Sequence, residues 1–202
     1  MRSVPALILA ACATYPDQAT TRQIAEKMVS EGYSAPTPAL LQRLAQDQSQ
    51  QICSKIGDAQ LTPEEAAEVI NLARASIRYP QSGKLVGDWK TGDNLAHDGA
   101  GDRLQGGKLE QRKENGGLCQ NCHGLAPDEI NVGNVGPSLA GYGARGNSEA
   151  ITKFTYEKIY NAWAFFPCSK MPRLGATGHL TPEQITHMVA YLIDPASPVN
   201  RK

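Results

Sequence analysis

The chain has 202 residues, 41% of them apolar, which is enough for one domain or two small ones. Its 20 basic residues balance its 20 acidic ones, and no basic stripe with interleaved aromatic residues is present, so nucleic acid is not an expected partner. No apolar run approaches the length that spans a bilayer.

Residues 1–13 have the pattern of an export signal. Arg2 supplies a positive charge, VPALILA a short apolar stretch, and ACA at residues 11–13 a small-residue cleavage pattern. The sequence LAAC, which ends at Cys12, also resembles a bacterial lipobox, in which the cysteine is acylated. We therefore predict export to the periplasm, with membrane attachment only if Cys12 is lipidated rather than removed.

Residues 14–80 are predicted to form a helical N-terminal extension. Helical patterns occur around residues 21–31 and 39–56, and a third helix opens at LTPEE, where Thr62 is the N-cap and Pro63 the first helical residue. The residues expected on its buried face are Ala66, Ile70, Ala73 and Ile77. No cluster of ligand-type side chains occurs here, so we interpret the extension as a structural element packed against the next domain.

Glycine dominates the middle of the chain. Fifteen of the 19 glycines lie between Gly83 and Gly146, so this stretch is predicted to consist mostly of turns and close backbone contacts. Residues 81–104 are accordingly expected to be a glycine-rich connecting segment. A flat cofactor that replaces part of a side-chain core is one physical reason for so much irregular structure.

The sequence CQNCH at residues 119–123 is the attachment signature of c-type haem. Two thiols one helical turn apart can add to the two vinyl groups on one edge of a porphyrin, and the next residue then lies under the iron. Cys119 and Cys122 are therefore predicted to carry the thioether bonds of one covalently bound haem c, with His123 as the proximal iron ligand. Half a zinc site or a thioredoxin-like pair is less favoured, because no second ligand pair follows and no βαβ pattern surrounds the motif.

A haem that carries electrons needs a second axial ligand. The candidates downstream of the motif are Met171, Met188, His179 and His187. Met188 and His187 fall in a periodic helix, where packing or solvent exposure explains them, and His179 falls in a glycine-rich loop. Met171 lies in a loop stiffened by two prolines, which lower the entropy cost of presenting one side chain. A thioether is a soft ligand, so we predict Met171 as the distal ligand, with core packing as the alternative.

Two amphipathic helices are predicted in the C-terminal half. Residues 147–166 carry apolar side chains at roughly helical spacing, and this pattern ends before Pro167. The last helix begins with Thr181 as N-cap and Pro182 at its first position, and Gln184 closes a capping box. Its apolar stripe consists of Ile185, Met188, Val189, Leu192 and Ile193.

Cys53 and Cys168 are the two cysteines that neither the export signal nor the haem motif uses. In an oxidising compartment they most simply pair, so we predict a disulfide between them. Two buried free thiols and a redox-active pair are the alternatives. The predicted bond would tie the extension to the loop that presents Met171.

The order of these features resembles class I cytochromes c over residues 105–194, where CQNCH is followed by GNVGPSL, a Met-Pro in a loop and a final amphipathic helix. The resemblance implies a mainly α fold, with a class I cytochrome c-like haem domain after the helical extension and a short tail at residues 195–202. It also implies that the carbonyl of Pro137 accepts a hydrogen bond from the proximal ligand His123 and fixes its orientation.

A narrower resemblance is carried by RYPQSGKLVGDWK, NGGLCQNCH, NAWAFFPCSKMPRLG and LTPEQI. Over about residues 45–194 these stretches are similar to the SoxX family, in its N-terminally extended type, of the SoxXA cytochromes of bacterial sulfur oxidation. The resemblance implies a periplasmic heterodimer with a SoxA-type cytochrome that has one or two haems. Such a complex couples thiosulfate oxidatively to a cysteine of the SoxYZ carrier protein.

On this resemblance the chain is the electron-transfer subunit of an L-cysteine S-thiosulfotransferase, and the catalytic site lies on SoxA, so no residue of this chain is catalytic. Joining thiosulfate to a thiol releases two electrons, whereas a single haem is a one-electron group, so electrons are expected to pass on to a soluble acceptor cytochrome. The alternative is a free-standing periplasmic cytochrome c that shuttles electrons without sulfur chemistry, for which residues 105–194 alone would suffice.

Overall fold

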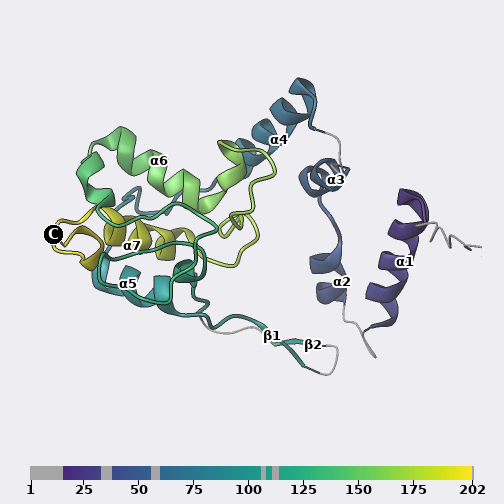
Figure 1. Ribbon diagram of the computed structural model, residues 1–202, viewed down its shortest axis with the longest axis horizontal. Helices are drawn as coiled ribbons and strands as arrows, with labels where there is room; N and C mark the ends of the chain where they lie inside the picture. Colours follow the sequence, from purple (N-terminus) through teal and green to yellow (C-terminus); the bar gives the residue numbers. More distant parts are fainter. Residues whose placement is uncertain (1–15, 33–37, 56–59, 106–107, 111–113, 202) are drawn as a thin grey trace, which may run out of the picture.

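The computed structural model describes residues 16–32, 38–55, 60–105, 108–110 and 114–201. The predicted export signal, with Cys12, lies outside these residues. Within them the chain is mainly helical, as the sequence predicts (Figure 1). None of the helices in these ranges combines the length and apolar character that crossing a membrane requires.

The N-terminal extension contains α1 (Gln18–Glu31), α2 (Pro38–Leu44), α3 (Gln48–Ser54) and α4 (Pro63–Ser76). α3 packs beside α4, whereas α1 and α2 lie on the right of Figure 1, away from the body formed by α5, α6 and α7. The single helix predicted at residues 39–56 is divided, because Asp47 starts a new helix. Its side chain accepts a hydrogen bond from the Gln50 N–H, and the Gln50 side chain accepts one from the Asp47 N–H.

α4 begins as the sequence predicts. The Thr62 side chain accepts a hydrogen bond from the Glu65 N–H, and Pro63 is the first helical residue. Val69 and Ala73 are the buried residues of this helix, at 0% and 2% exposure. The predicted buried face is therefore rotated slightly, because Val69 rather than Ile70 points into the interior.

A helix that the sequence prediction missed, α5 (Trp89–His97), lies inside the predicted connecting segment at residues 81–104. α5 crosses α7 (Pro182–Ile193) at Gly92, where a Cβ atom would lie 2.0 Å from the His187 carbonyl oxygen. Only a residue without a side chain allows this approach of the two helices. The segment is thus part of the haem-motif domain, and the predicted boundary at residue 105 has to move toward the N-terminus. The same glycine pattern that suggested turns here reflects a close helix contact.

α5 is followed by a short antiparallel hairpin of β1 (Arg103–Gln105) and β2 (Lys108–Glu110), with Leu104 opposite Leu109. The hairpin extends from the body on the side of α5 (Figure 1).

α6 (Glu149–Tyr160) packs against α7. The helix predicted at residues 147–166 ends early, because Asn161 leaves the helical conformation with φ −150° and ψ 97°, and Ala162–Ala164 continue as one turn of 3₁₀ helix. Asn161 is buried, and its side-chain amide donates a hydrogen bond of 2.9 Å to Oγ of Ser76 at the end of α4. This buried contact joins the extension to the haem-motif domain.

α7 is largely buried and starts with the predicted capping box, in which Thr181 accepts from the Gln184 N–H and Pro182 is the first helical residue. The core around it includes Leu95, Leu125, Tyr156, Ile159, Leu180, Ile185, Val189, Tyr191 and Val199. Val199 belongs to the stretch predicted as a tail at residues 195–202, yet it is completely buried and its carbonyl accepts a hydrogen bond of 2.7 Å from the Gly141 N–H. The predicted tail is therefore partly core.

Candidate haem site

The CQNCH motif forms one tight turn. Leu118 precedes it in the left-handed conformation, with φ 43°, and the N–H groups of Cys122 and His123 both donate to the Cys119 carbonyl. Both motif cysteines carry free thiols. Burial raises the pKa of the Cys119 thiol to about 11. The turn therefore presents two thiols and one imidazole from five consecutive residues.

The His123 ring is fixed by the glycine-rich loop that follows the motif. Its Nδ1–H donates a hydrogen bond of 2.7 Å to the Pro137 carbonyl, which is the contact that the class I cytochrome c resemblance implies. A Cβ atom on Gly136 would lie 2.2 Å from Cε1 of His123, so the loop passes directly against the ring. Because Nδ1 is engaged, Nε2 is the nitrogen left to bind a metal.

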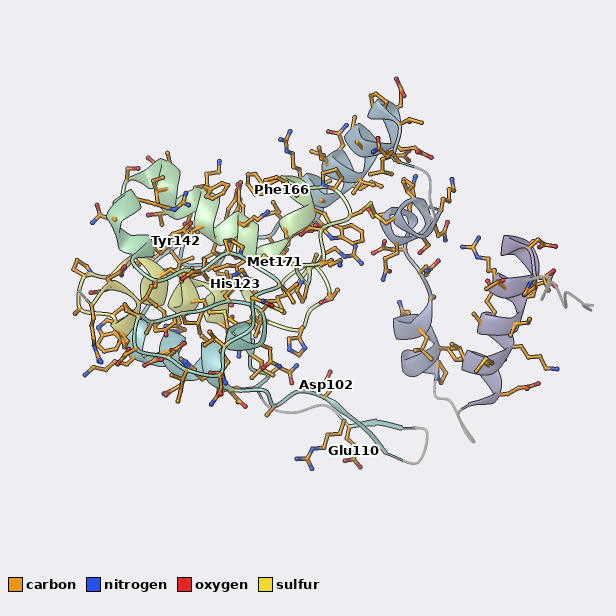
Figure 2. The ribbon with its side chains drawn as sticks, viewed as in Figure 1. Asp102, Glu110, His123, Tyr142, Phe166 and Met171 are labelled. Carbon is orange, nitrogen blue, oxygen red and sulfur yellow. A yellow bond between two sulfur atoms is a disulfide. The ribbon has the colours of Figure 1, made fainter. Side chains whose placement is uncertain are left out.

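His123 and Met171 line the same cavity, and Figure 2 shows both residues together in the middle of the haem-motif domain. Met171 is half-buried, packs against the core and donates its N–H to Oγ of Ser169. The remaining lining residues are Ala96, Cys119, Leu125, Leu139, Ile159, Leu174, Met188, Tyr191 and Leu192. Nearly all of these side chains are apolar, which suits the faces of a porphyrin.

The other candidate ligands have different surroundings. Met188 also lines the cavity, but it is 2% exposed in α7, and its methyl group lies next to Gly117 on the side of Cys119. Nε2 of His179 donates to the Gly116 carbonyl at 2.9 Å, and Nδ1 of His187 accepts from the Asp88 N–H at 2.8 Å. Neither histidine is among the residues that line the cavity. Met171 stays the predicted distal ligand.

His97 has a role that sequence reasoning missed. At the end of α5, its Nδ1–H donates to the Asp93 carbonyl at 2.8 Å and its Nε2 lies 2.9 Å from the Glu129 carboxylate. Glu129 also accepts from the Leu125 N–H, so the histidine links α5 to the loop after the haem motif. Burial disfavours the charged ring, but the hydrogen bonds to Asp93 and Glu129 outweigh it and raise the His97 pKa. The i, i+4 spacing to Asp93 was the available signal, whereas the contact with Glu129 depends on the fold.

The predicted disulfide is present in the structure. Cys53 of α3 and Cys168 are bonded, with their Cα atoms 5.5 Å apart, and they are separated by 115 positions in sequence. Cys168 lies three residues before Met171. The alternative of two buried free thiols is therefore wrong for this structure, whereas a redox-active pair is not tested by it.

The residues present fit a haem c. The Cys119 thiol, the imidazole of His123 with its free Nε2 and the thioether of Met171 border a cavity whose lining is otherwise mostly apolar, and the second free thiol, that of Cys122, lies in the same tight turn. Within the described ranges, no group of three or more His, Cys, Asp or Glu side chains is placed to hold a bare metal ion. A donor set of this kind suits iron held in a porphyrin, because the cofactor would supply the remaining nitrogen ligands.

Two comparisons with known proteins bear on this site. The family model described as cytochrome c oxidase, cbb3-type, subunit III matches residues 109–192, which include the CQNCH motif and Met171. A protein of Aquifex aeolicus (strain VF5) named uncharacterized lipoprotein is 45% identical to this chain over 159 residues, or 78% of this chain and 74% of the relative. The family match thus falls on the segment where the predicted site residues meet.

Proposed function

This chain belongs to the class I cytochromes c and to the same family as the Aquifex aeolicus lipoprotein, and on that premise we propose that it is the electron-transfer subunit of a SoxXA-type complex. When bound, haem c supplies a one-electron redox couple at its iron. Cys119 and Cys122 would hold one haem through two thioether bonds, and His123 and Met171 would be the axial ligands.

The observation that carries the electron-transfer role is the meeting of His123 and Met171 at one apolar cavity. Nε2 of His123 and Sδ of Met171 are the atoms that would bind the iron. Two protein ligands leave no open position, which favours electron transfer over the binding of oxygen or substrate at the metal. The hydrogen bond from His123 to Pro137 holds the imidazole in one orientation and makes it a better donor.

The sulfur-oxidising role rests on the likeness of four sequence stretches to the SoxX family and on the chemistry that this chain can offer. Thiosulfate and a carrier thiol form an S–S bond with release of one proton and two electrons. Cys53 and Cys168 are bonded to each other, and Cys119 and Cys122 are assigned to the haem, so no described cysteine is left to accept sulfur. The substrate site would therefore lie on a SoxA-type partner, and this chain would relay electrons to a soluble acceptor.

We further propose that the mature protein resides in the periplasm. The relative in Aquifex aeolicus is named a lipoprotein, which favours the lipobox reading, in which Cys12 is acylated and becomes the first residue. The intact mass of the protein from a membrane fraction tests the lipobox reading: an added diacylglycerol and fatty acid on Cys12 support it, whereas an unmodified N-terminus beyond residue 13 contradicts it and supports a cleaved export signal.

Met171→Ala, made in a host that matures c-type cytochromes, tests the ligand assignment. We expect the haem to stay covalently attached, the reduction potential to fall, and the long-wavelength charge-transfer band of methionine-ligated iron to disappear. Met188→Ala is the matched control, since it removes a second methionine from the same cavity and should keep this band. An unchanged spectrum of the Met171 variant would show that Met171 is not an iron ligand.

The partner assignment needs the mature wild-type protein from thiosulfate-grown cells. We expect it to co-purify with a SoxA-type cytochrome, and the mixture to become reduced when thiosulfate and SoxYZ are added together. Reduction that needs no partner, or transfer of electrons only between respiratory complexes, would instead support a free-standing shuttle. A protein that carries covalently attached haem but binds no sulfur-pathway partner would support the cytochrome assignment and contradict the sulfur-oxidising role.

A further inference from the structure

Met171 lies between two points at which α3 of the extension holds the same loop. We call residues 168–173 the ligand loop. At one end Cys168 is bonded to Cys53, and at the other Arg173 forms an ion pair with Asp47, with 2.7 Å between Nη1 and Oδ2. Met171 is three residues from the first point and two from the second. Both anchors come from one short helix.

Asp47 uses its two carboxylate oxygens for two different tasks. Oδ1 accepts the Gln50 N–H at 2.8 Å and so caps α3, while Oδ2 faces Arg173. The start of α3 and the far end of the ligand loop therefore share one side chain. The capping box already satisfies the backbone N–H groups at the start of α3, so the helix itself does not require the contact between Asp47 and Arg173.

Arg173 is held on its other side by the haem-motif domain. Its side chain is only 11% exposed, and its guanidinium lies 4.4 Å from the centre of the Trp163 ring. The Trp163 Nε1–H donates to the Ser169 carbonyl at 2.8 Å, and Oγ of Ser169 accepts the Met171 N–H. A continuous set of contacts thus runs from Asp47 through Arg173 and Trp163 to the backbone of Met171.

α3 is held in place by its packing against α4. Ser49 and Ile52 are buried, and α3 packs on α4, where Gln48 donates to the Glu68 carboxylate. α4 packs on the 3₁₀ turn at Ala162–Ala164, which contains Trp163. α3, which holds the ligand loop, is therefore connected through α4 to the turn that contains Trp163.

We propose that α3 is a two-point clamp on the ligand loop, in which Asp47 and Arg173 are positioning residues that keep Met171 at the iron. This inference rests on the proposed His123/Met171 ligation. The disulfide alone fixes the Cys168 end and leaves the loop able to pivot about it. The ion pair blocks that pivot, because Arg173 cannot leave the Trp163 face without losing both its ring contact and its carboxylate.

The test measures how fast imidazole replaces the native distal ligand in the mature oxidised protein, since replacement must wait for Met171 to leave. Asp47→Asn removes the charge that Arg173 faces, yet asparagine caps helices about as well as aspartate. We expect replacement to become about 1.5- to 5-fold faster, the range for a partly exposed ion pair. Asp17→Asn is the matched control, because Asp17 caps α1 through the Thr20 N–H in the same way. It should leave the rate unchanged.

Arg173→Gln and the Asp47→Asn/Arg173→Gln double variant show whether the two residues act as a pair. We expect Arg173→Gln to speed replacement more than Asp47→Asn, because it also loses the Trp163 contact, and the double variant to match Arg173→Gln alone. Hydrogen exchange of the backbone amides in residues 169–174 provides a second readout, and it should rise in the same order.

If the iron has a methionine ligand but Asp47→Asn shows the same rates of imidazole replacement and of hydrogen exchange as wild type, the clamp is wrong and the proposed function stays intact. Additive effects in the double variant would also overturn it, since independent sites do not form one clamp. A wild-type protein whose iron lacks a methionine ligand would overturn the clamp and the proposed function together.

Discussion

At the scale of single residues, the geometry of His123 depends on the residues beside it as much as on the motif. Gly136 leaves space for the ring, and the Pro137 carbonyl accepts its Nδ1–H. Both residues occur in the sequence GNVGPSL, so the class I cytochrome c resemblance was enough to anticipate the Pro137 contact. The exclusion of any side chain at position 136 follows from the fold, which brings the Gly136 backbone against the His123 ring.

His97 is the residue for which a pH effect is expected. Both of its ring nitrogens face acceptors, the Asp93 carbonyl and the Glu129 carboxylate, and only the protonated ring can donate to both. The Asp93 carboxylate lies 3.0 Å from Nδ1, and the Tyr191 ring contacts the imidazole edge-on. Burial lowers the pKa of His97, but the hydrogen bonds and charges of Asp93 and Glu129 outweigh it and raise this pKa in the folded state.

The sign of the effect follows from this raised pKa. The contribution of His97 to stability is fully present below its unfolded-state pKa of about 6.5 and is lost as the pH rises through the higher folded-state value. His97→Gln should therefore lower the unfolding free energy by about 1 kcal/mol at acidic pH and by less at alkaline pH. Urea titrations at about pH 5.5 and about pH 8.5 measure this difference.

His179→Gln is the control for that measurement, because His179 donates to a backbone carbonyl rather than to carboxylates. A His97 variant whose loss of stability is the same at both pH values would contradict the ionic role of the residue.

At the scale of elements, the crossing of α5 and α7 builds one wall of the site. Ala96 of α5 and Met188, Tyr191 and Leu192 of α7 all line the cavity. Gly92 sets the distance between the two helices, because its Cα faces the His187 carbonyl. The apolar stripe of α7 is evident from the sequence, whereas α5 is short and lies in a glycine-rich segment whose composition predicts turns.

Gly92→Ala is expected to destabilise the protein. Alanine favours a helix interior over glycine by about 0.5–1 kcal/mol, but its Cβ would lie 2.0 Å from backbone atoms that cannot give way easily. Such overpacking typically costs about 1–3 kcal/mol, so the net change in unfolding free energy should be a loss. Thermal unfolding of the mature protein followed by circular dichroism measures it.

Gly101→Ala serves as the comparison, since the nearest atom to its Cβ would be Cε1 of the His179 side chain, which can shift. Equal melting temperatures for the Gly92 variant and wild type would show that the two helices can separate at little cost.

At the scale of the whole molecule, the disulfide decides how the extension and the haem-motif domain behave together. It joins α3 to the ligand loop through two cysteines that are 115 positions apart in sequence. A cross-link of that span restricts the unfolded chain strongly. α4 adds packing and the Asn161–Ser76 hydrogen bond, so the extension is held by more than one bond.

Replacing both bridge cysteines, Cys53→Ser/Cys168→Ser, should lower the unfolding free energy by about 2–5 kcal/mol. Cys168 has φ 59°, and serine would carry the same backbone strain, so the difference reports the bridge. Urea titration of the mature protein measures the change, and reduction of wild type should reproduce it. Identical titration midpoints for variant and wild type would mean that the bond contributes no stability.

The sequence by itself determined the parts of this protein that depend on neighbouring residues. The CQNCH turn, the capping boxes at Thr62 and Thr181, and the apolar stripe of α7 are local patterns, and their physics acts over one or two turns of chain. Only the tertiary structure decided that α5 crosses α7 at Gly92, that His97 meets Glu129 and that Asp47 meets Arg173. These contacts join residues 32 to 126 positions apart, and no local pattern encodes which distant partner a side chain will meet.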